Sequence, residues 1–308
     1  MGLTGERLGK GMGLKKLLWS VVLISALLGV AGETAAAQSG LRVEVFPKVI
    51  RQGDVILVKT YGQASFASIH GEFQGKKFSL DPGGRQGTYE GLIGIDLEAK
   101  PAGYELRVAA TGGDGKAYAK SLQLKVEKVE FAVQKLSLPK SMVDLDPKTL
   151  ERVNRESKRL RTLFHGIREE KVWKGPFLRP VDGEISGAFG NRRIINGQRK
   201  SPHSGVDLRA DEGTPVAACN NGIVALVDEF FFTGKTVILD HGRGLYSMYF
   251  HLSKAGVGEG DKLRAGDELG LVGSTGRSTG PHLHWGMILR GARVDPFSFL
   301  RLDKHILE

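Results

Sequence analysis

Cysteine is almost absent from this chain. Its 308 residues include one, Cys219, so no disulfide can form within the chain and the fold does not depend on an oxidising compartment. Cys219 follows the apolar residues 216–218, and we expect it to be a small buried core residue. Proline is also scarce, with 11 residues, whereas the 43 glycines are about double the usual share of ~7%. With little helical periodicity in most of the chain, this composition predicts short strands joined by many turns.

Several functional motifs are missing as well. The sequence has no helical HExxH zinc motif, and the glycine-containing segment 273–278 lacks the lysine of a phosphate-binding loop. Residues 266–273 have the turn pattern of a biotinyl or lipoyl carrier, but no Met-Lys pair is present to carry such a group. Basic and aromatic residues are not interleaved, and no zinc-finger spacing occurs, so nucleic acid is not an expected partner.

Acidic residues are too few to balance the basic ones. The formal net charge is +10, of which residues 1–37 contribute +2 and the rest of the chain +8. Such a surplus favours polyanionic surroundings, which include nucleic acid, anionic lipid and acidic cell-wall polymers. Composition by itself does not choose among them.

Residues 1–37 have the pattern of a secretory signal peptide. Lys15 and Lys16 precede a mostly apolar run over residues 17–32, and residues 35–37 are three alanines that suit a cleavage site. The run is shorter than the ~20 apolar residues of a typical spanning helix, which favours cleavage over a retained anchor. We therefore expect export to the periplasm or cell envelope, with membrane attachment only through an uncleaved signal segment.

Residues 38–128 are predicted to form an all-β domain. Apolar residues alternate over 41–45, 104–108 and 122–126, and residues 54–58 form a further candidate strand. Glycine-rich turns separate these segments, a spacing typical of an immunoglobulin-like β-sandwich, although the Cys–Trp–Cys core of antibody domains is missing. No catalytic constellation occurs here, so this domain is expected to be a spacer, a binding module for other cell-envelope proteins, or a cover for a groove elsewhere.

A helical connector is expected over residues 129–174. Asp146 and Pro147 have the pattern of a helix cap followed by proline at the first helical position, and the helix should end near Gly166. One face carries arginines and lysines, which are either solvated on a docked helix or in contact with an anionic surface. The other face is predicted to be an apolar stripe, formed by Leu150, Val153, Leu160, Phe164 and Ile167.

The remaining segment, residues 175–308, contains strand-like runs and most of the histidines. His282 and His284 lie in a strand-like segment, where alternate side chains share a face. His203 and Asp207 lie in a non-helical stretch between two prolines, and His251 is a further candidate. Imidazole and carboxylate ligands suit a catalytic zinc ion with one open coordination position. The spacing alone does not say which histidine of the pair in the strand would bind the metal.

The three segments His203-xxx-Asp207, Tyr249-x-His251-Leu252 and Gly280-Pro-His-Leu-His284 together resemble peptidase family M23, whose members include lysostaphin-like and LytM-type peptidoglycan endopeptidases. The resemblance covers about residues 177–296. It implies a mainly β chain with an antiparallel metallopeptidase domain of lysostaphin-like type and one Zn²⁺ per chain. It also implies that His203, Asp207 and His284 bind the zinc and that His251 and His282 are the catalytic acid–base groups.

The same resemblance implies peptidoglycan as the substrate, with hydrolysis of peptide bonds in its cross-links or stem peptides. A different class of function is a non-catalytic or autoinhibited wall-binding regulator of a separate amidase, because some relatives have lost zinc ligands. All five site positions are filled here, which favours the enzyme; the bond that is cut is not indicated. Three further expectations concern the surroundings of the site: His241 is a structural residue or flanks the groove, Asn196 lies near the groove, and Thr275, Arg277 and Ser278 line its wall.

Overall fold

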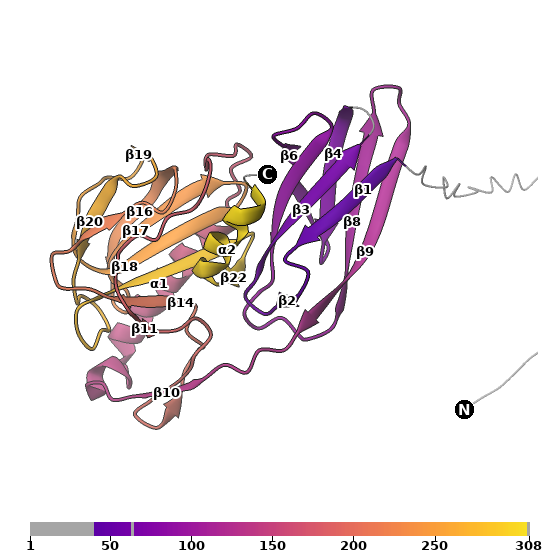
Figure 1. Cartoon of the computed structure of the whole chain (residues 1–308). Coiled ribbons are helices and arrows are strands. Elements are labelled where there is room, and N and C mark those ends of the chain that lie inside the picture. The colour runs from indigo at the N-terminus through magenta and orange to yellow at the C-terminus, as the bar shows by residue number, and fades with distance from the viewer. Residues whose placement is uncertain (1–39, 63–64, 307–308) are drawn as a thin grey trace, which may run out of the picture. The chain divides into compact units, whose positions relative to one another are not determined.

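A computed structural model describes residues 40–62 and 65–306. The expected signal peptide, residues 1–37, lies outside the described residues. The described residues belong to one compact unit of the chain, and they are mainly β-structure with a single long helix (Figure 1). None of the described helices combines the length and apolar character needed to cross a membrane. The mainly β fold class expected from the sequence is confirmed.

The N-terminal β-structure consists of two sheets that pack face to face, as Figure 1 shows in indigo to magenta. Leu106 and Val108 are buried while Arg107 between them is exposed, so the alternation in the sequence marks the inner face. The inner faces enclose one apolar core. The first sheet has the order β1 (Leu41–Phe46), β3 (Val55–Gly62), β7 (Thr88–Gly94), β6 (Asp81–Pro82), and the second β2 (Ile50–Arg51), β9 (Ala117–Glu127), β8 (Gly103–Gly112), β4 (Phe66–Phe73), β5 (Lys76–Ser79).

The strand order of this sandwich is that of immunoglobulin-like domains. Naming β1, β3, β4, β6, β7, β8 and β9 as strands A to G gives one sheet in the order A-B-E-D and neighbours G-F-C in the other. The Tyr104 hydroxyl, at the start of β8, donates a hydrogen bond of 2.7 Å to the carbonyl of Lys100. This contact is the tyrosine corner of such sandwiches, and it holds the chain where it enters a late strand.

The connector contains a short strand, β10 (Val133–Leu136), a 3₁₀ turn (Lys140–Met142) and helix α1 (Pro147–His165). The predicted cap is confirmed, because the Asp146 carboxylate accepts a hydrogen bond from the backbone N–H of Thr149 at 3.0 Å. The helix ends at Gly166, as expected. The two halves of α1 differ in their packing, whereas the sequence predicted one apolar stripe along the whole helix.

The C-terminal half of α1 packs on the large sheet through Leu160, Leu163 and Phe164. Leu150, near the other end, is 48% exposed, and Ile167 lies beyond the helix and is 44% exposed. The basic face is partly used for docking, because Arg159 forms an ion pair with Asp228 on the sheet. The stripe therefore covers the sheet only over its C-terminal half.

The C-terminal sheet is antiparallel and carries the histidine-rich segments (Figure 1, orange to yellow). Its central strands are buried on both faces: Val237 and Leu239 face one apolar core, and Ile238 faces a second core under α1. Cys219 is fully buried, as predicted. The main path is β11 (Ile185–Gly187), β14 (Gly205–Arg209), β21 (His282–Leu289), β18 (Leu245–Ala255), β17 (Gly234–Gly242), β16 (Gly222–Phe230), β19 (Lys262–Leu263), with β15 (Pro215–Ala217), β20 (Glu268–Val272) and β22 (Ala292–Val294) attached and α2 (Pro296–Ile306) following.

A small third sheet ties the connector to the C-terminal half. Its strands β12 (Arg192–Ile195) and β13 (Gln198–Arg199) form a hairpin, and β10 pairs in parallel with β12. Asn196 and Gly197 form the turn with φ values of 50° and 78°, which is the left-handed geometry that Asn-Gly favours in tight hairpins. This sheet places one side chain of β12 directly against the histidine cluster.

Candidate metal centre

Neighbouring strands bring the site residues onto one face of the C-terminal sheet. In β21, His284 lies opposite Asp207 of β14, and His282 lies opposite Arg209. Val206 and Leu208 of β14 point into the apolar core on the other face. The alternation of β-structure thus separates the site residues from the core residues.

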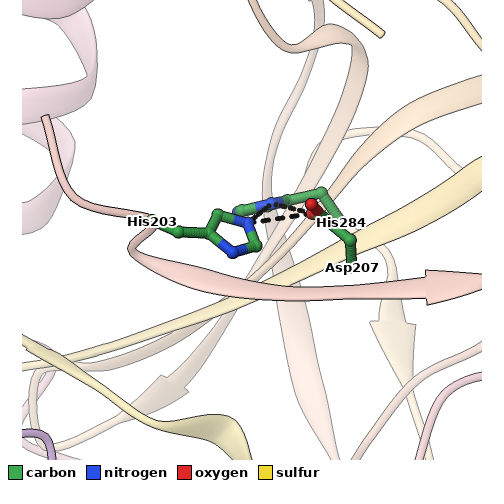
Figure 2. A group of neighbouring side chains, drawn as sticks. All are labelled: His203, Asp207 and His284. Carbon is green, nitrogen blue, oxygen red and sulfur yellow. Dashed lines mark hydrogen bonds and ion pairs between the residues drawn. The ribbon is translucent and has the colours of Figure 1, made fainter. Parts of the chain in front are cut away.

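Three ligand-type atoms converge in this place (Figure 2). His203 Nε2 lies 2.9 Å from Asp207 Oδ1 and 2.9 Å from His284 Nδ1, and His284 Nδ1 lies 2.8 Å from Asp207 Oδ1. All three side chains are buried, with at most 7% of each residue exposed. Buried histidines and carboxylates at such distances form a set that can hold a cation. The structure therefore brings together the three residues that the sequence resemblance assigned to the metal.

The electrostatics of the cluster keep its carboxylate ionised. Burial alone would raise the pKa of Asp207, but hydrogen bonds with His203 and His284 hold the pKa well below its usual range. Burial lowers the pKa of His284 to about 4. An ionised carboxylate and a neutral imidazole are the forms in which these groups bind a metal.

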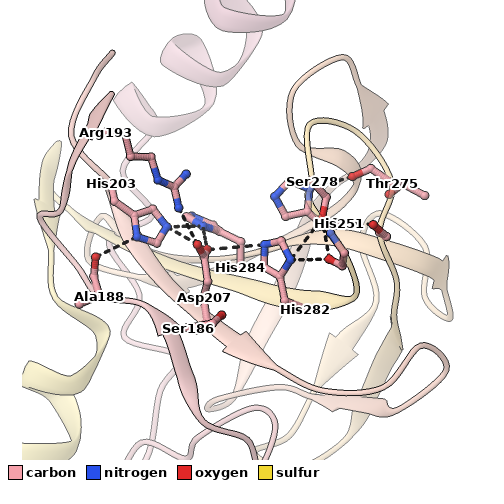
Figure 3. Close-up of polar contacts among 12 residues, drawn as sticks. Ser186, Ala188, Arg193, His203, Asp207, His251, Thr275, Ser278, His282 and His284 are labelled. Carbon is pink, nitrogen blue, oxygen red and sulfur yellow. Dashed lines mark hydrogen bonds and ion pairs between the residues drawn. The ribbon is translucent and has the colours of Figure 1, made fainter. Parts of the chain in front are cut away.

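His251 and His282 lie beside this cluster (Figure 3). Each uses Nδ1 in a hydrogen bond of 2.8 Å with a backbone carbonyl, that of Thr275 for His251 and that of Gly280 for His282. These bonds place the ring proton on Nδ1 and leave a lone pair on Nε2. The Nε2 atom of His282 lies 3.8 Å from Asp207 Oδ1, and the rings of His251 and His282 are 4.8 Å apart. Two imidazoles are therefore oriented next to the candidate metal position.

The backbone at His251 is strained. Its φ is 64°, a conformation that residues other than glycine rarely adopt. A hydrogen bond of 2.8 Å from the backbone N–H of His251 to the carbonyl of Thr233 holds this geometry. Such strain costs of order 1–3 kcal/mol and persists where the surrounding structure imposes it, often at functional sites.

Two glycines make room for the candidate ligands, and the sequence did not single them out as site residues. A Cβ on Gly187 would lie 2.4 Å from Asp207 Oδ2, and a Cβ on Gly205 would lie 2.5 Å from the Trp285 carbonyl oxygen and 2.6 Å from His284 Nε2. On its other side, the His284 ring stacks on Phe250 with an interplanar angle of 3°. The side chains of the candidate ligands are thus fixed by close packing as well as by hydrogen bonds.

Arg193 is a further residue that the sequence did not reveal. It comes from β12, and its guanidinium lies 2.5 Å from Asp207 Oδ2, the carboxylate oxygen that does not face the two histidines. Partners of this kind orient a ligating carboxylate and affect metal affinity. The connector strand β10 pairs Gln134 with Arg193, so the position of Arg193 depends on a long-range contact that no local pattern announces.

The structure also tests the expected positions of four residues around the histidine cluster. His241 is fully buried in β17, where Nδ1 is 2.6 Å from the carbonyl of Asn221 and Nε2 is 2.7 Å from the Ser247 hydroxyl, so its role is structural. Asn196 does not face the groove, because its side-chain amide exchanges two hydrogen bonds with the backbone of Leu138. Thr275 and Ser278 contact the histidines from behind.

A groove runs past the cluster, and its walls come from different parts of the chain. His203, His251 and His284 border it on the sheet side. The opposite wall is apolar and belongs to the connector, with Leu145 and Leu150 among its residues. No residue of the described sandwich, 40–62 and 65–128, lines this groove. The part of the chain that borders the groove is therefore the connector, and not the N-terminal sheets considered as a cover.

Comparisons with known proteins agree with this site. The family model described as Peptidase family M23 matches residues 201–296, the segment that holds all five site residues. Among curated proteins, the peptidoglycan DD-endopeptidase ShyA of Vibrio cholerae is 40% identical over 38% of this chain, and the DD-carboxypeptidase/endopeptidase Mpg of Neisseria meningitidis is 40% identical over 37%. The matches span only 28% and 26% of the length of these two relatives.

Among solved structures, one from Pseudomonas aeruginosa, titled as a peptidase M23, covers 81% of this chain and 94% of its own. It is 30% identical, with a TM-score of 0.62. This match includes much of the chain outside the segment recognised by the family model. The chain belongs to peptidase family M23.

Proposed function

We propose that this protein is a zinc-dependent endopeptidase that hydrolyses peptide bonds in peptidoglycan cross-links or stem peptides. The observation that carries the proposal is that one nitrogen of His203, one nitrogen of His284 and one carboxylate oxygen of Asp207 lie within 2.9 Å of one another. Two further histidines lie alongside. The names of the relatives support the substrate, because they include peptidoglycan DD-endopeptidases. A bond between two D-configured residues is the cleavage site those names suggest.

The donor set fits zinc. Two imidazole nitrogens and one carboxylate oxygen are among the ligands that zinc prefers, and three protein ligands leave one position open for catalysis. The observed separations of 2.8–2.9 Å are slightly shorter than the edges, about 3.4 Å, of a tetrahedron with bonds of about 2.1 Å. A zinc ion held by His203, Asp207 and His284 would supply Lewis acidity for polarising the substrate carbonyl and for lowering the pKa of water.

His251 and His282 are the proposed acid–base groups. Each has a lone pair on Nε2, because its Nδ1 proton is donated to a carbonyl oxygen, so each can accept a proton at Nε2. Hydrolysis requires one group to take a proton from water and one to give a proton to the departing amine. Burial and the neighbouring histidines lower the pKa of His251 to about 3, so its imidazole is in the neutral form at neutral pH.

The remaining parts of the proposal concern organisation and location. We assign residues 1–37 to a signal peptide, 38–128 to the immunoglobulin-like domain, 129–174 to the connector and 175–308 to the peptidase domain. Peptidoglycan-acting relatives support a cell-envelope location, which agrees with the expected signal peptide. A non-catalytic regulator is not favoured, because no ligand or acid–base position has been lost.

The test combines metal content with digestion of purified peptidoglycan. We expect one zinc per chain and release of new amino groups by the wild type, loss of zinc and product in His284→Ala, and zinc without product in His251→Ala. Cys219→Ser, which alters a buried residue outside the site, serves as a control for handling and folding. Zinc binding with no product from any wall preparation would refute the enzymatic proposal.

A further inference from the structure

The groove beside the metal centre has an uneven charge. Three cationic side chains line it, Arg193, Lys200 and Arg277, and its lining residues include no aspartate or glutamate. The facing connector wall is apolar, so it offers no charge to balance them. A groove of this kind attracts an anionic ligand.

Two of the three cations already have partners within the protein. Arg193 forms the ion pair with Asp207, and the Lys200 ammonium donates a hydrogen bond of 2.7 Å to the side-chain oxygen of Gln198. Asp207 is itself a candidate metal ligand. Gln198 is uncharged, so Lys200 also lacks a counter-ion, but Arg277 is the groove cation whose guanidinium lies over an aromatic ring.

Arg277 is held in place without a carboxylate. Its guanidinium lies 4.0 Å from the centre of the Phe232 ring, and its backbone N–H donates to the carbonyl of Phe232 at 2.9 Å. Within the described residues, no acidic side chain lies within 4.0 Å of its nitrogens, although the side chain is partly buried. Burial and the nearby Arg193 lower the pKa of Arg277, as expected of a guanidinium that lacks a counter-ion.

Among the partly buried arginines elsewhere in the described chain, Arg179 and Arg290 donate to backbone carbonyl groups, and two others have carboxylate partners. Arg293 pairs with Asp96 and Arg243 with Asp81. Stacking on an aromatic ring fixes the plane of a guanidinium while leaving its N–H groups available for a bidentate contact with a carboxylate. Arg277 therefore has the features of a preformed carboxylate-binding group.

We propose that Arg277 binds a free carboxylate of the peptide substrate, so that the groove selects acidic peptides over neutral ones. This inference rests on the proposed function, because it names the substrate chemistry of the same site. The carboxylate belongs either to a side chain or to the end of the peptide. The apolar connector wall would contact the uncharged part of the same peptide.

The test uses cross-linked muropeptide dimers released from purified peptidoglycan, in three forms: unmodified, with only the side-chain carboxylates amidated, and with only the terminal carboxylates amidated. Charge-assisted hydrogen bonds contribute enough to change kcat/KM by about ten- to one-hundred-fold. We expect a loss of that size when the relevant carboxylate is amidated. Arg277→Gln should show the same loss on the unmodified dimer and no further loss on the amidated one.

Two variants separate substrate binding from structure. Arg277→Lys keeps the charge and should recover part of the activity, whereas Arg107→Gln, an exposed charge removal in the N-terminal sandwich, should match the wild type. Equal activity of wild type and Arg277→Gln on unmodified dimers, or equal use of all three dimers by the wild type, would overturn the inference while leaving the proposed function intact.

A binding experiment is needed in case the protein hydrolyses none of the dimers. Calorimetry would measure the binding of the same three dimers to the zinc-loaded His251→Ala protein. If no dimer is hydrolysed but binding still depends on the carboxylate and on Arg277, the inference holds and the proposed function fails. If binding affinity depends neither on the substrate carboxylate nor on Arg277, the inference is wrong, whether or not the protein hydrolyses peptidoglycan. If Arg277→Gln fails to fold, hydrolysis of the three dimers by the wild type still tests whether the groove recognises a substrate carboxylate.

Discussion

The N-terminal sandwich and the C-terminal sheet are both mainly antiparallel β-structures with alternating apolar residues, but they differ in the kinds of side chain that they bury. The core of the sandwich is apolar, and Thr60 is the one polar residue buried within its described part. The ten other buried polar or charged residues of the described chain all follow residue 200. Burying such groups costs free energy unless they are paired, so their concentration in one region indicates where the chemistry lies.

The largest effect is expected from Gly205→Ala, which removes space next to a ligand. The new methyl group would lie 2.5 Å from the carbonyl oxygen of Trp285, so backbone or His284 must shift. A misplaced ligand should lower zinc affinity and activity by at least about one-hundred-fold. Zinc content and hydrolysis rates measure this.

The matched control is Gly113→Ala in the sandwich, where an added Cβ meets nothing within 4 Å. It should leave zinc content and activity unchanged. Full zinc occupancy in Gly205→Ala would contradict the idea that close packing fixes the metal ligands.

Leu106→Ala tests whether the apolar core of the sandwich contributes to stability without affecting the candidate metal site. Leu106 is fully buried, and removing its side chain should lower the free energy of unfolding by about 2–5 kcal/mol. Because no residue of the described sandwich, 40–62 and 65–128, lines the groove at the candidate metal centre, zinc stoichiometry of the folded protein should stay the same. Denaturant unfolding and metal analysis check both parts; a loss of zinc without unfolding would show that the two regions are coupled.

The buried polar network of the C-terminal sheet should make stability depend on pH through His241. Burial lowers its pKa from 6.5 to about 4, so between these values the unfolded chain binds a proton that the folded chain does not. The free energy of unfolding should therefore fall as the pH drops from about 6.5 to about 4, by about 3 kcal/mol for this residue.

This pH effect is measured as the difference in unfolding free energy between pH 7.5 and pH 4.5. In His241→Gln the amide does not titrate, so that difference should shrink relative to the wild type. Taking the difference between the two proteins cancels the other titrating groups. Identical pH profiles would show that His241 does not contribute.

A smaller effect is expected from Arg193→Gln, which removes the charged partner of Asp207 Oδ2. Loss of such a partner should weaken zinc binding by about ten- to one-hundred-fold, as measured by competition with a chelator. Arg192→Gln is the matched control on the same strand, because Arg192 is exposed and lies 3.9 Å from Glu98. Equal chelator sensitivity of both variants would mean that Arg193 does not position the carboxylate.

Local features were predictable from the sequence because they depend on neighbours in the chain. The Asp146 cap, the alternation of β1 and β8, and the shared face of His282 and His284 all follow from fixed backbone geometry over a few residues. The family resemblance added the choice of His284 as a ligand, which spacing alone left open. These elements recur in the structure where they were expected.

Contacts between segments that are distant in the sequence could be seen only in the tertiary structure. Arg193 reaches Asp207 because β12 pairs with β10, Gly187 approaches the same carboxylate from β11, and Leu150 of α1 borders the groove instead of the core. None of these residues belongs to a local pattern. The sequence by itself thus indicated a candidate metal site of histidines and an aspartate, together with the main strands and the long helix, since these depend on residue type and short spacing. The supporting residues and the groove walls were decided by packing between segments far apart in the chain.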